Sequence, residues 1–261
     1  MKSVLVAAAV TALTVTSASA ADLAARPYTK APPVVAEVNS WSGFYVGASA
    51  GYGWSDIDHQ SLNTTGSFWA TQARFGGLQT VNPTGAVYGG QIGYNWQSAN
   101  WVFGLEAAGF GTDLRRNEAS IFAPGTDFLS ARIEGLFTAA GRVGYALNNW
   151  LPYIKGGYAG AQIGTINASP TFFDVSLNHS EWRSGYIVGA GIEYAMTQNW
   201  IAGIEYNYLD FGSSSWTQIN RTGTGALFQP NQPESYRDKV TMQTVTVRLS
   251  YKLGGPIVAR Y

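Results

Sequence analysis

The sequence contains no cysteine, few charged residues and, after its first twenty positions, no long apolar run. Without cysteine, the chain has neither a disulfide framework nor a thiolate zinc site. Charged residues make up 12% of the chain, about half the roughly 25% of a soluble globular domain, which indicates that much of the surface does not face water. Sixteen basic and sixteen acidic residues leave no net charge, so the basic footprint of a nucleic-acid-binding protein is missing.

The first twenty residues have the parts of a secretory signal peptide. Lys2 provides a positive start, an apolar run covers residues 4–15, and Ala18-Ser19-Ala20 is a small-residue cleavage site. We therefore expect residues 1–20 to be removed by cleavage between Ala20 and Ala21. The proline-rich residues 21–40 are expected to be an extended linker.

From Trp41 onward, apolar residues recur at every second position, which is typical of a strand with one apolar face. Phe44, Val46 and Ala48 lie on one face of the first such segment, and Tyr45 and Gly47 lie on the other. Eight segments follow this pattern, the one at 151–165 least regularly. Their lengths of about ten residues or more match the 9–11 that a tilted strand needs to cross a bilayer, whereas strands usually have about 5–6 residues.

The connections between these segments alternate in length. The short ones are 97–100, 148–149 and 197–199, and the long ones are 56–84, 112–131, 166–180 and 213–237. Short periplasmic turns and long extracellular loops are the pattern of outer-membrane barrels. We therefore predict an all-β fold, an eight-stranded antiparallel up-and-down transmembrane β-barrel over residues 41–254. A signal peptide and a short periplasmic linker precede it, residues 255–261 form a C-terminal tail, and both chain ends lie in the periplasm.

An aromatic repeat accompanies the short turns. Asn-Trp ends each turn, at 100–101, 149–150 and 199–200, and a tyrosine precedes it. Tyrosine and tryptophan rings favour the bilayer interface, so we predict an aromatic girdle made of Tyr94, Trp101, Tyr145, Trp150, Tyr194 and Trp200. A soluble propeller, whose blades also carry tryptophan, has shorter strands and is the less favoured interpretation.

The opposite face of the strands carries the charges. The predicted lumen charge network consists of Glu106, Arg142, Arg183, Glu193, Glu205, Arg248 and Lys252, with Glu134 and Lys155 as additional members. Side chains fill the interior of an eight-stranded barrel, and an unpaired buried charge costs several kcal/mol. We therefore expect paired charges that plug the lumen, with a narrow ion path as the alternative.

No pattern of catalytic, cofactor-binding or metal-ligating residues stands out. His59 and His179 fall in predicted extracellular loops and are interpreted as solvated. The alternative is a weak calcium site, or the rim of a barrel enzyme, built on Asp56, Asp58 and His59. Arginines in or beside the long loops could bind lipopolysaccharide phosphates through bidentate bonds, although acidic residues share these loops. They are Arg74, Arg115, Arg116, Arg132, Arg221 and Arg237.

Several stretches resemble a known family. Trp41-Ser-Gly-Phe-Tyr-Val-Gly-Ala48, Gly89-Gly-Gln-Ile-Gly-Tyr-Asn-Trp96 and the final Val-Arg-Leu-Ser-Tyr-Lys-Leu253 look like the small porin-like outer membrane immunogenic proteins of alphaproteobacteria. These proteins are similar to the transmembrane domain of OmpA. The resemblance implies a surface-exposed barrel in the outer membrane of a Gram-negative bacterium. Such a barrel contributes to envelope integrity and has no catalytic residues or cofactor.

The resemblance also implies partners. They are outer-membrane lipid, lipopolysaccharide and the assembly machinery that reads an aromatic near the C-terminus, here Tyr251 or Tyr261. Some members are thought to be joined to peptidoglycan through an N-terminal Ala-Asp, which makes Ala21 and Asp22 the candidate attachment point. A small porin-like diffusion channel and, less favoured, a lipid-modifying barrel enzyme are the alternative functions.

Overall fold

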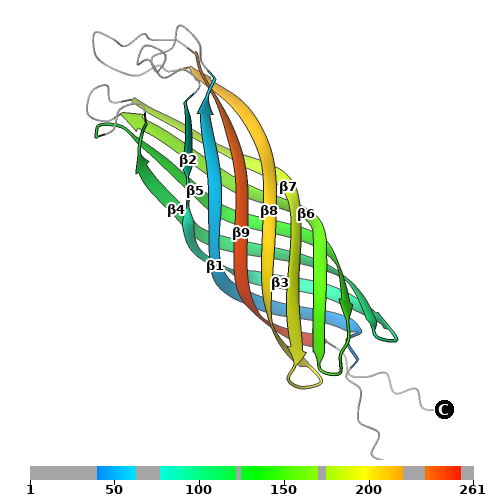
Figure 1. The fold of residues 1–261 in the computed structure, drawn as a ribbon. Helices are drawn as coiled ribbons and strands as arrows, with labels where there is room; N and C mark the ends of the chain where they lie inside the picture. Colours follow the sequence, from blue (N-terminus) through cyan, green and yellow to red (C-terminus); the bar gives the residue numbers. More distant parts are fainter. Residues whose placement is uncertain (1–39, 63–76, 122–124, 170–174, 220–232, 254–261) are drawn as a thin grey trace, which may run out of the picture. The chain divides into compact units, whose positions relative to one another are not determined.

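The computed structural model describes residues 40–62, 77–121, 125–169, 175–219 and 233–253. They belong to one compact unit, Val38–Tyr261, built from antiparallel strands (Figure 1). These strands are β1 (Gly43–Ser61), β2 (Leu78–Val81), β3 (Thr84–Ser98), β4 (Trp101–Ala119), β5 (Phe128–Tyr145), β6 (Trp150–Ser169), β7 (Val175–Ala195), β8 (Trp200–Ile219) and β9 (Pro233–Leu253). No helix in these ranges is long and apolar enough to cross a membrane.

The sheet closes into a ring. Consecutive strands pair from β3 through β9, and β1 pairs with both β3 and β9. β2 also pairs with β1, just beyond the end of β3. β2 and β3 are one strand interrupted at Asn82 and Pro83, because proline has no N–H for the ladder. The predicted eight-stranded antiparallel barrel is confirmed, with its second strand in two pieces.

The strands are longer than the sequence pattern indicates. Apart from β2 they contain 15 to 21 residues, and they continue into segments predicted as long loops. Residues 112–119, for example, belong to β4 rather than to a loop. Backbone pairing continues through polar residues after the apolar alternation has stopped, so the alternation marks only part of each strand.

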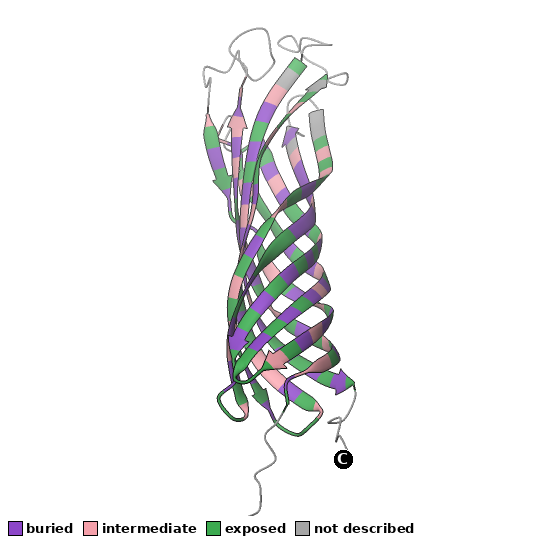
Figure 2. Ribbon diagram, turned by 90° about the vertical axis from the view of Figure 1, so that its right-hand side faces the viewer, coloured by how far each residue is buried: buried purple, intermediate pink, exposed green. Residues whose placement is uncertain are grey.

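Side chains alternate between the outside and the lumen of the barrel, as Figure 2 shows by the alternating burial along each strand. Two apolar layers lie in the lumen. The first, at the end with the short turns, consists of Trp41, Val102, Ala146, Leu151, Ala195 and Ile201. The second is larger, lies further along the strands and includes Ile57, Leu114, Ile133, Ile187, Leu209 and Met242. The lumen between the two layers is polar.

Three short turns join β3 to β4, β5 to β6, and β7 to β8 at one end of the barrel (Figure 1). Ala99 and Asn148 adopt left-handed backbone conformations in the first two turns, with φ of 51° and 55°. The same end holds the start of β1 and the end of β9, because Phe44 pairs with Leu253. The predicted signal peptide, residues 1–20, and the predicted linker, residues 21–40 except the last, lie outside the described residues, and so does the predicted tail, residues 255–261, with Tyr261.

Candidate functional site

Six charged side chains meet in the polar layer of the lumen. They are Glu106 on β4, Arg142 on β5, Lys155 on β6, Glu193 on β7, Glu205 on β8 and Arg248 on β9. Three carboxylates face three cations, so the group is neutral. Each side chain is only 2–4% exposed. We call this group the lumen charge cluster.

The charges in this cluster are paired across the barrel. Arg142 donates two hydrogen bonds to the carboxylate of Glu193, at 3.1 and 2.5 Å. Lys155 bridges Glu106 at 3.2 Å and Glu205 at 2.7 Å, and Arg248 also donates to both of these carboxylates. Each charge therefore has a partner, which buried ions require because removal from water is costly.

Two lumenal tyrosines complete the cluster. The hydroxyl of Tyr45 donates to Glu106 at 2.8 Å, and that of Tyr153 donates to Glu205 at 2.6 Å. The Arg142 guanidinium lies 4.0 Å from the ring centroid of Tyr153, a favourable cation–π contact. A Cβ atom on Gly191 would approach the Tyr153 hydroxyl to 2.6 Å, so glycine is required for the ring to lie there.

A second polar group lies in the lumen near the end opposite the short turns. Nδ1 of His59 donates to Asp238 at 2.6 Å, and the indole of Trp216 donates to the other carboxylate oxygen at 2.8 Å. Tyr236 stacks on His59 with ring centroids 4.6 Å apart, and His179 stacks on Trp216 at 4.4 Å. These five residues form a continuous packed group, which we call the mouth cluster.

The electrostatics of the mouth cluster favour an ionised Asp238. Burial opposes its ionisation, but the hydrogen bond and charge of His59, the hydrogen bond from Trp216 and the charge of Arg183 outweigh burial. The pKa of Asp238 therefore lies below its ordinary value. The outward neighbour Lys239 is exposed, so this part of β9 extends beyond the apolar outer surface.

The outer surface of the barrel is a continuous apolar band. Ile154 is 66% exposed, Val247 63% and Leu105 60%. A contiguous apolar surface of this extent is rare on a protein that faces water. Aromatic pairs border the band at the short turns. Ring centroids lie 5.3 Å apart for Trp101 and Tyr145, 4.7 Å for Trp150 and Tyr194, and 5.1 Å for Trp200 and Tyr251.

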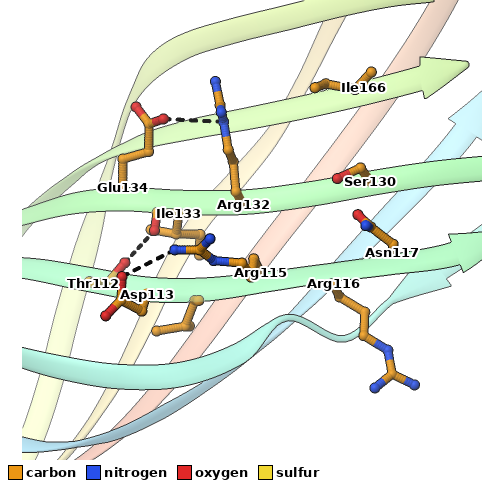
Figure 3. Close-up of a pocket in the computed structure, with 11 residues that line it drawn as sticks. Thr112, Asp113, Arg115, Arg116, Asn117, Ser130, Arg132, Ile133, Glu134 and Ile166 are labelled. Carbon is orange, nitrogen blue, oxygen red and sulfur yellow. Dashed lines mark hydrogen bonds and ion pairs between the residues drawn. The ribbon is translucent and has the colours of Figure 1, made fainter.

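A pocket of about 470 Å³ lies on β4 and β5 toward the opposite end of the barrel (Figure 3). Arg115 and Arg132 occupy facing positions in the pairing of these strands. Each forms an ion pair on its own strand, Arg115 with Asp113 and Arg132 with Glu134, both at 3.2 Å. We call this site the outer arginine pocket.

Comparison with known proteins places the chain in a family. Residues 6–252 match the family described as "Outer membrane protein beta-barrel domain". The chain belongs to this outer-membrane β-barrel family. It is 31% identical to the 25 kDa outer-membrane immunogenic protein of Brucella ovis over 226 residues, which are 86% of this chain and 96% of the relative. It is 30% identical to the 31 kDa outer-membrane immunogenic protein of Brucella melitensis over 259 residues, which are 97% of this chain and all of the relative.

Solved structures of other barrels also match. Ail of Yersinia pestis is 13% identical with a TM-score of 0.39, and the match covers 81% of this chain and 99% of that one. OprG of Pseudomonas aeruginosa is 12% identical with a TM-score of 0.43, over 81% of this chain and 97% of that one. The family assignment and the curated relatives confirm the predicted location in the Gram-negative outer membrane.

The outer-membrane barrel brings five of the seven predicted network residues together, with Lys155 as the sixth charge. Arg183 instead lies at the mouth cluster, where it donates to the backbone oxygens of Asp238 and Gly212 at 3.0 and 2.9 Å. Lys252 lies near the short turns and donates to the backbone of Ser40. Glu134 is outside the lumen, because register shifts beside Gly111 and Gly135 change which residues face outward.

The predicted positions of the histidines in solvated loops are wrong. His59 lies in β1 and is 2% exposed, and His179 lies in β7. Alternation turns His59 into the lumen, whereas Asp56 and Asp58 accept hydrogen bonds from Asn82 and Thr80 on the outer side. These three residues therefore do not converge on a cation.

All six predicted girdle residues face outward at the short-turn end. The two lumenal tyrosines of the charge cluster were not among the predicted network residues. Their positions in the alternation, on the same face as the charges, are the signal that could have found them.

Proposed function

We propose that this outer-membrane barrel is a structural, surface-exposed component of the envelope that neither conducts ions nor catalyses a reaction. The observation that carries the proposal is the burial of the lumen charge cluster. A conducting path needs wetted charges along the lumen, but these six side chains are 2–4% exposed. Apolar layers on both sides of the cluster add further barriers to ions.

Single-channel recording in planar bilayers tests the proposal. We expect the purified protein to give no reproducible unitary current, since the lumen is filled as in other narrow barrels. A gel with unboiled and boiled samples serves as the folding control, because a folded barrel resists SDS until it is heated. A reproducible unitary conductance from protein that passes this control would overturn the proposal in favour of the diffusion channel.

The barrel-enzyme alternative rests on the mouth cluster, which contains both histidines. His59 and Asp238 form an acid–base pair, but His59 is 2% exposed and packs against Tyr236. A general base must reach the proton that it removes from a substrate. The burial of this pair favours a structural role, in keeping with relatives that are named as immunogenic proteins rather than as enzymes.

We also propose that the mature N-terminus is attached to peptidoglycan. The proposal is supported by the sequence alone, through the predicted cleavage before Ala21, the Ala21-Asp22 pair and the proline-rich spacer. Lysozyme-digested envelopes should release the protein with a muropeptide on the Ala21 amine. Mass spectrometry that finds a free Ala21 amine on every copy would contradict this attachment without affecting the proposal on conductance.

A further inference from the structure

Two arginines face each other across neighbouring strands in the outer arginine pocket. Arg115 and Arg132 are directly opposed in the register of β4 and β5, and like charges in this position destabilise a sheet. The ion pairs with their carboxylate partners do not offset this repulsion. Both ion pairs are solvent-exposed, and such pairs contribute little to stability. A pair of opposed guanidinium groups beside the register shift between β4 and β5 suggests a site for an anion.

The height of the pair above the short turns limits what that anion is. Fourteen positions on β4 separate Arg115 from the girdle residue Trp101. With a rise of about 3.3 Å per residue and a strand tilt of about 35–45°, this corresponds to roughly 33–38 Å along the barrel axis. The apolar band of an outer-membrane barrel is only about 25 Å tall. The arginines therefore lie just outside the hydrocarbon, on the extracellular side, at the level of lipid headgroups.

The pocket supplies suitable donors for a phosphate group. Besides the two guanidinium groups, it is lined by the amide of Asn117 and the hydroxyl of Ser130. The ion pairs occupy only Nη2 of Arg115 and Nε of Arg132, and guanidinium groups bind phosphate through paired hydrogen bonds. The side chain of Arg116 points away from the other two arginines in Figure 3 and pairs with Glu118.

The other side of the barrel differs at this level. Lys239 is an outward cation on β9, but its register partner on β1 is Asp58, so opposite charges face each other there. At a similar height on the other side, a cation therefore faces a carboxylate, whereas on β4 and β5 a cation faces another cation. This difference makes Lys239 a matched control for the arginine pair.

We propose that Arg115 and Arg132 bind a phosphate group of the phosphorylated glycolipid in the outer leaflet, with Asn117 and Ser130 as additional donors. The site faces the membrane rather than the lumen. It is therefore independent of whether the barrel conducts, and either proposal can fail without the other.

The test uses the full-length protein folded in non-ionic detergent and titrated with bisphosphorylated lipid A. Binding is followed by the rise in the temperature at which the folded band disappears from SDS gels. We expect the double variant Arg115→Gln, Arg132→Gln to bind at least about tenfold more weakly, because it loses the charge-assisted hydrogen bonds to the phosphate. Lys239→Gln should bind like the unmodified protein.

Three further arms sharpen the result. Dephosphorylated lipid A should bind weakly to all variants. Inorganic pyrophosphate should neither bind nor compete at the same concentrations, because it lacks the acyl chains that hold the lipid at this depth. The charge-conserving variant Arg115→Lys, Arg132→Lys should fall between the unmodified protein and the glutamine variant, because lysine cannot form the paired hydrogen bonds.

Several outcomes would overturn the proposal. Equal binding by the unmodified protein and the glutamine variant would remove the arginines from the site. An equal loss in Lys239→Gln would reduce the effect to general charge attraction, as would full binding by the lysine variant. Effective competition by pyrophosphate would assign the site to a soluble phosphate instead of the lipid. Since the lysine variant keeps every charge, it tests the arginines even when the glutamine variant does not fold.

Discussion

The effect of substituting a charged residue in the lumen depends mainly on whether its partner is still present. Arg142 and Glu193 are both 2–4% exposed and are joined by two hydrogen bonds. Replacing only one of them leaves the other as a buried, unpaired charge. Replacing both removes both charges together with their interaction, so no unpaired charge remains. The lumen charge cluster is therefore a coupled unit in which the effect of one substitution depends on a second position.

We predict that Arg142→Met lowers the free energy of unfolding by about 3–5 kcal/mol, because Glu193 is left as an uncompensated buried charge. The double variant Arg142→Met, Glu193→Met should be less destabilised than Arg142→Met alone. Urea unfolding in lipid vesicles measures both effects, and Lys239→Met, on the outer surface, is the exposed control. The single variant Glu193→Met completes the comparison. A double variant whose loss of stability equals the sum of the losses in Arg142→Met and Glu193→Met would contradict the coupling.

Asp238 gives the barrel a pH-dependent contribution to stability. Its pKa in the folded protein is lowered, so folding favours the ionised form. The contribution is complete above the pKa of the unfolded chain, near 3.9 for a free aspartate, and is lost as the pH falls through the lower folded value. We expect Asp238→Asn to be less stable than the unmodified protein at pH 7 and to lose less stability between pH 7 and pH 2.

The thermal transition of the folded band at several pH values measures this difference. Asp58→Asn is the control, since Asp58 lies on the outer side of the neighbouring strand and accepts a hydrogen bond from Thr80. If Asp238→Asn and the unmodified protein follow parallel pH curves, Asp238 makes no such contribution.

At the scale of the strand, the solvent on each side decides which substitutions are tolerated. β4 carries Leu105 in the middle of the apolar band and Ala119 at the end of the strand opposite the short turns. Both residues are exposed. A charged substitution at an exposed site of a water-soluble protein usually changes stability by less than about 0.5 kcal/mol. On a lipid-facing strand, the cost depends on depth.

We predict that Leu105→Arg destabilises the barrel by about 2–4 kcal/mol, the cost of arginine near the bilayer midplane. Ala119→Arg on the same strand should cost less than about 1 kcal/mol, because this position lies beyond the hydrocarbon. Folding equilibria in phospholipid vesicles give both values. Equal costs for the two variants would mean that lipid does not contact Leu105.

At the scale of the whole molecule, closure between β1 and β9 completes the barrel. This pairing runs from Phe44 and Leu253 to Ser61 and Tyr236. Without β9, the edges of β1 and β8 would expose unpaired N–H and C=O groups to hydrocarbon, each at a cost of several kcal/mol. The last strand is therefore as necessary for insertion as any apolar segment.

We expect a chain that ends before residue 233 to lose the SDS-resistant folded band entirely after refolding into detergent. A chain that ends after residue 253 retains every described strand and should keep the band. Refolding of purified protein makes the comparison independent of the cellular assembly machinery. A folded band from the shorter chain would show that closure by β9 is not needed.

The fold class, the number of strands, the short turns and the outward-facing residues of the girdle can all be predicted from the sequence alone. These features follow from period-two alternation and from turn spacing, which are local properties of the chain. Prediction of the eight-stranded barrel therefore required no long-range information. Composition indicated in addition that much of the surface does not face water, because it is poor in charge.

Which charges meet, and where the strands end, follows from the three-dimensional arrangement of the strands and not from the local pattern. Alternation assigns Glu106, Arg183 and Lys252 to the lumen but not to a height within it, which depends on strand register and tilt. Strand ends were missed because polar residues pair through their backbones as well as apolar ones do, and this placed His59 in a loop instead of the lumen. Register joins residues far apart in the chain, so a local pattern contains no record of it.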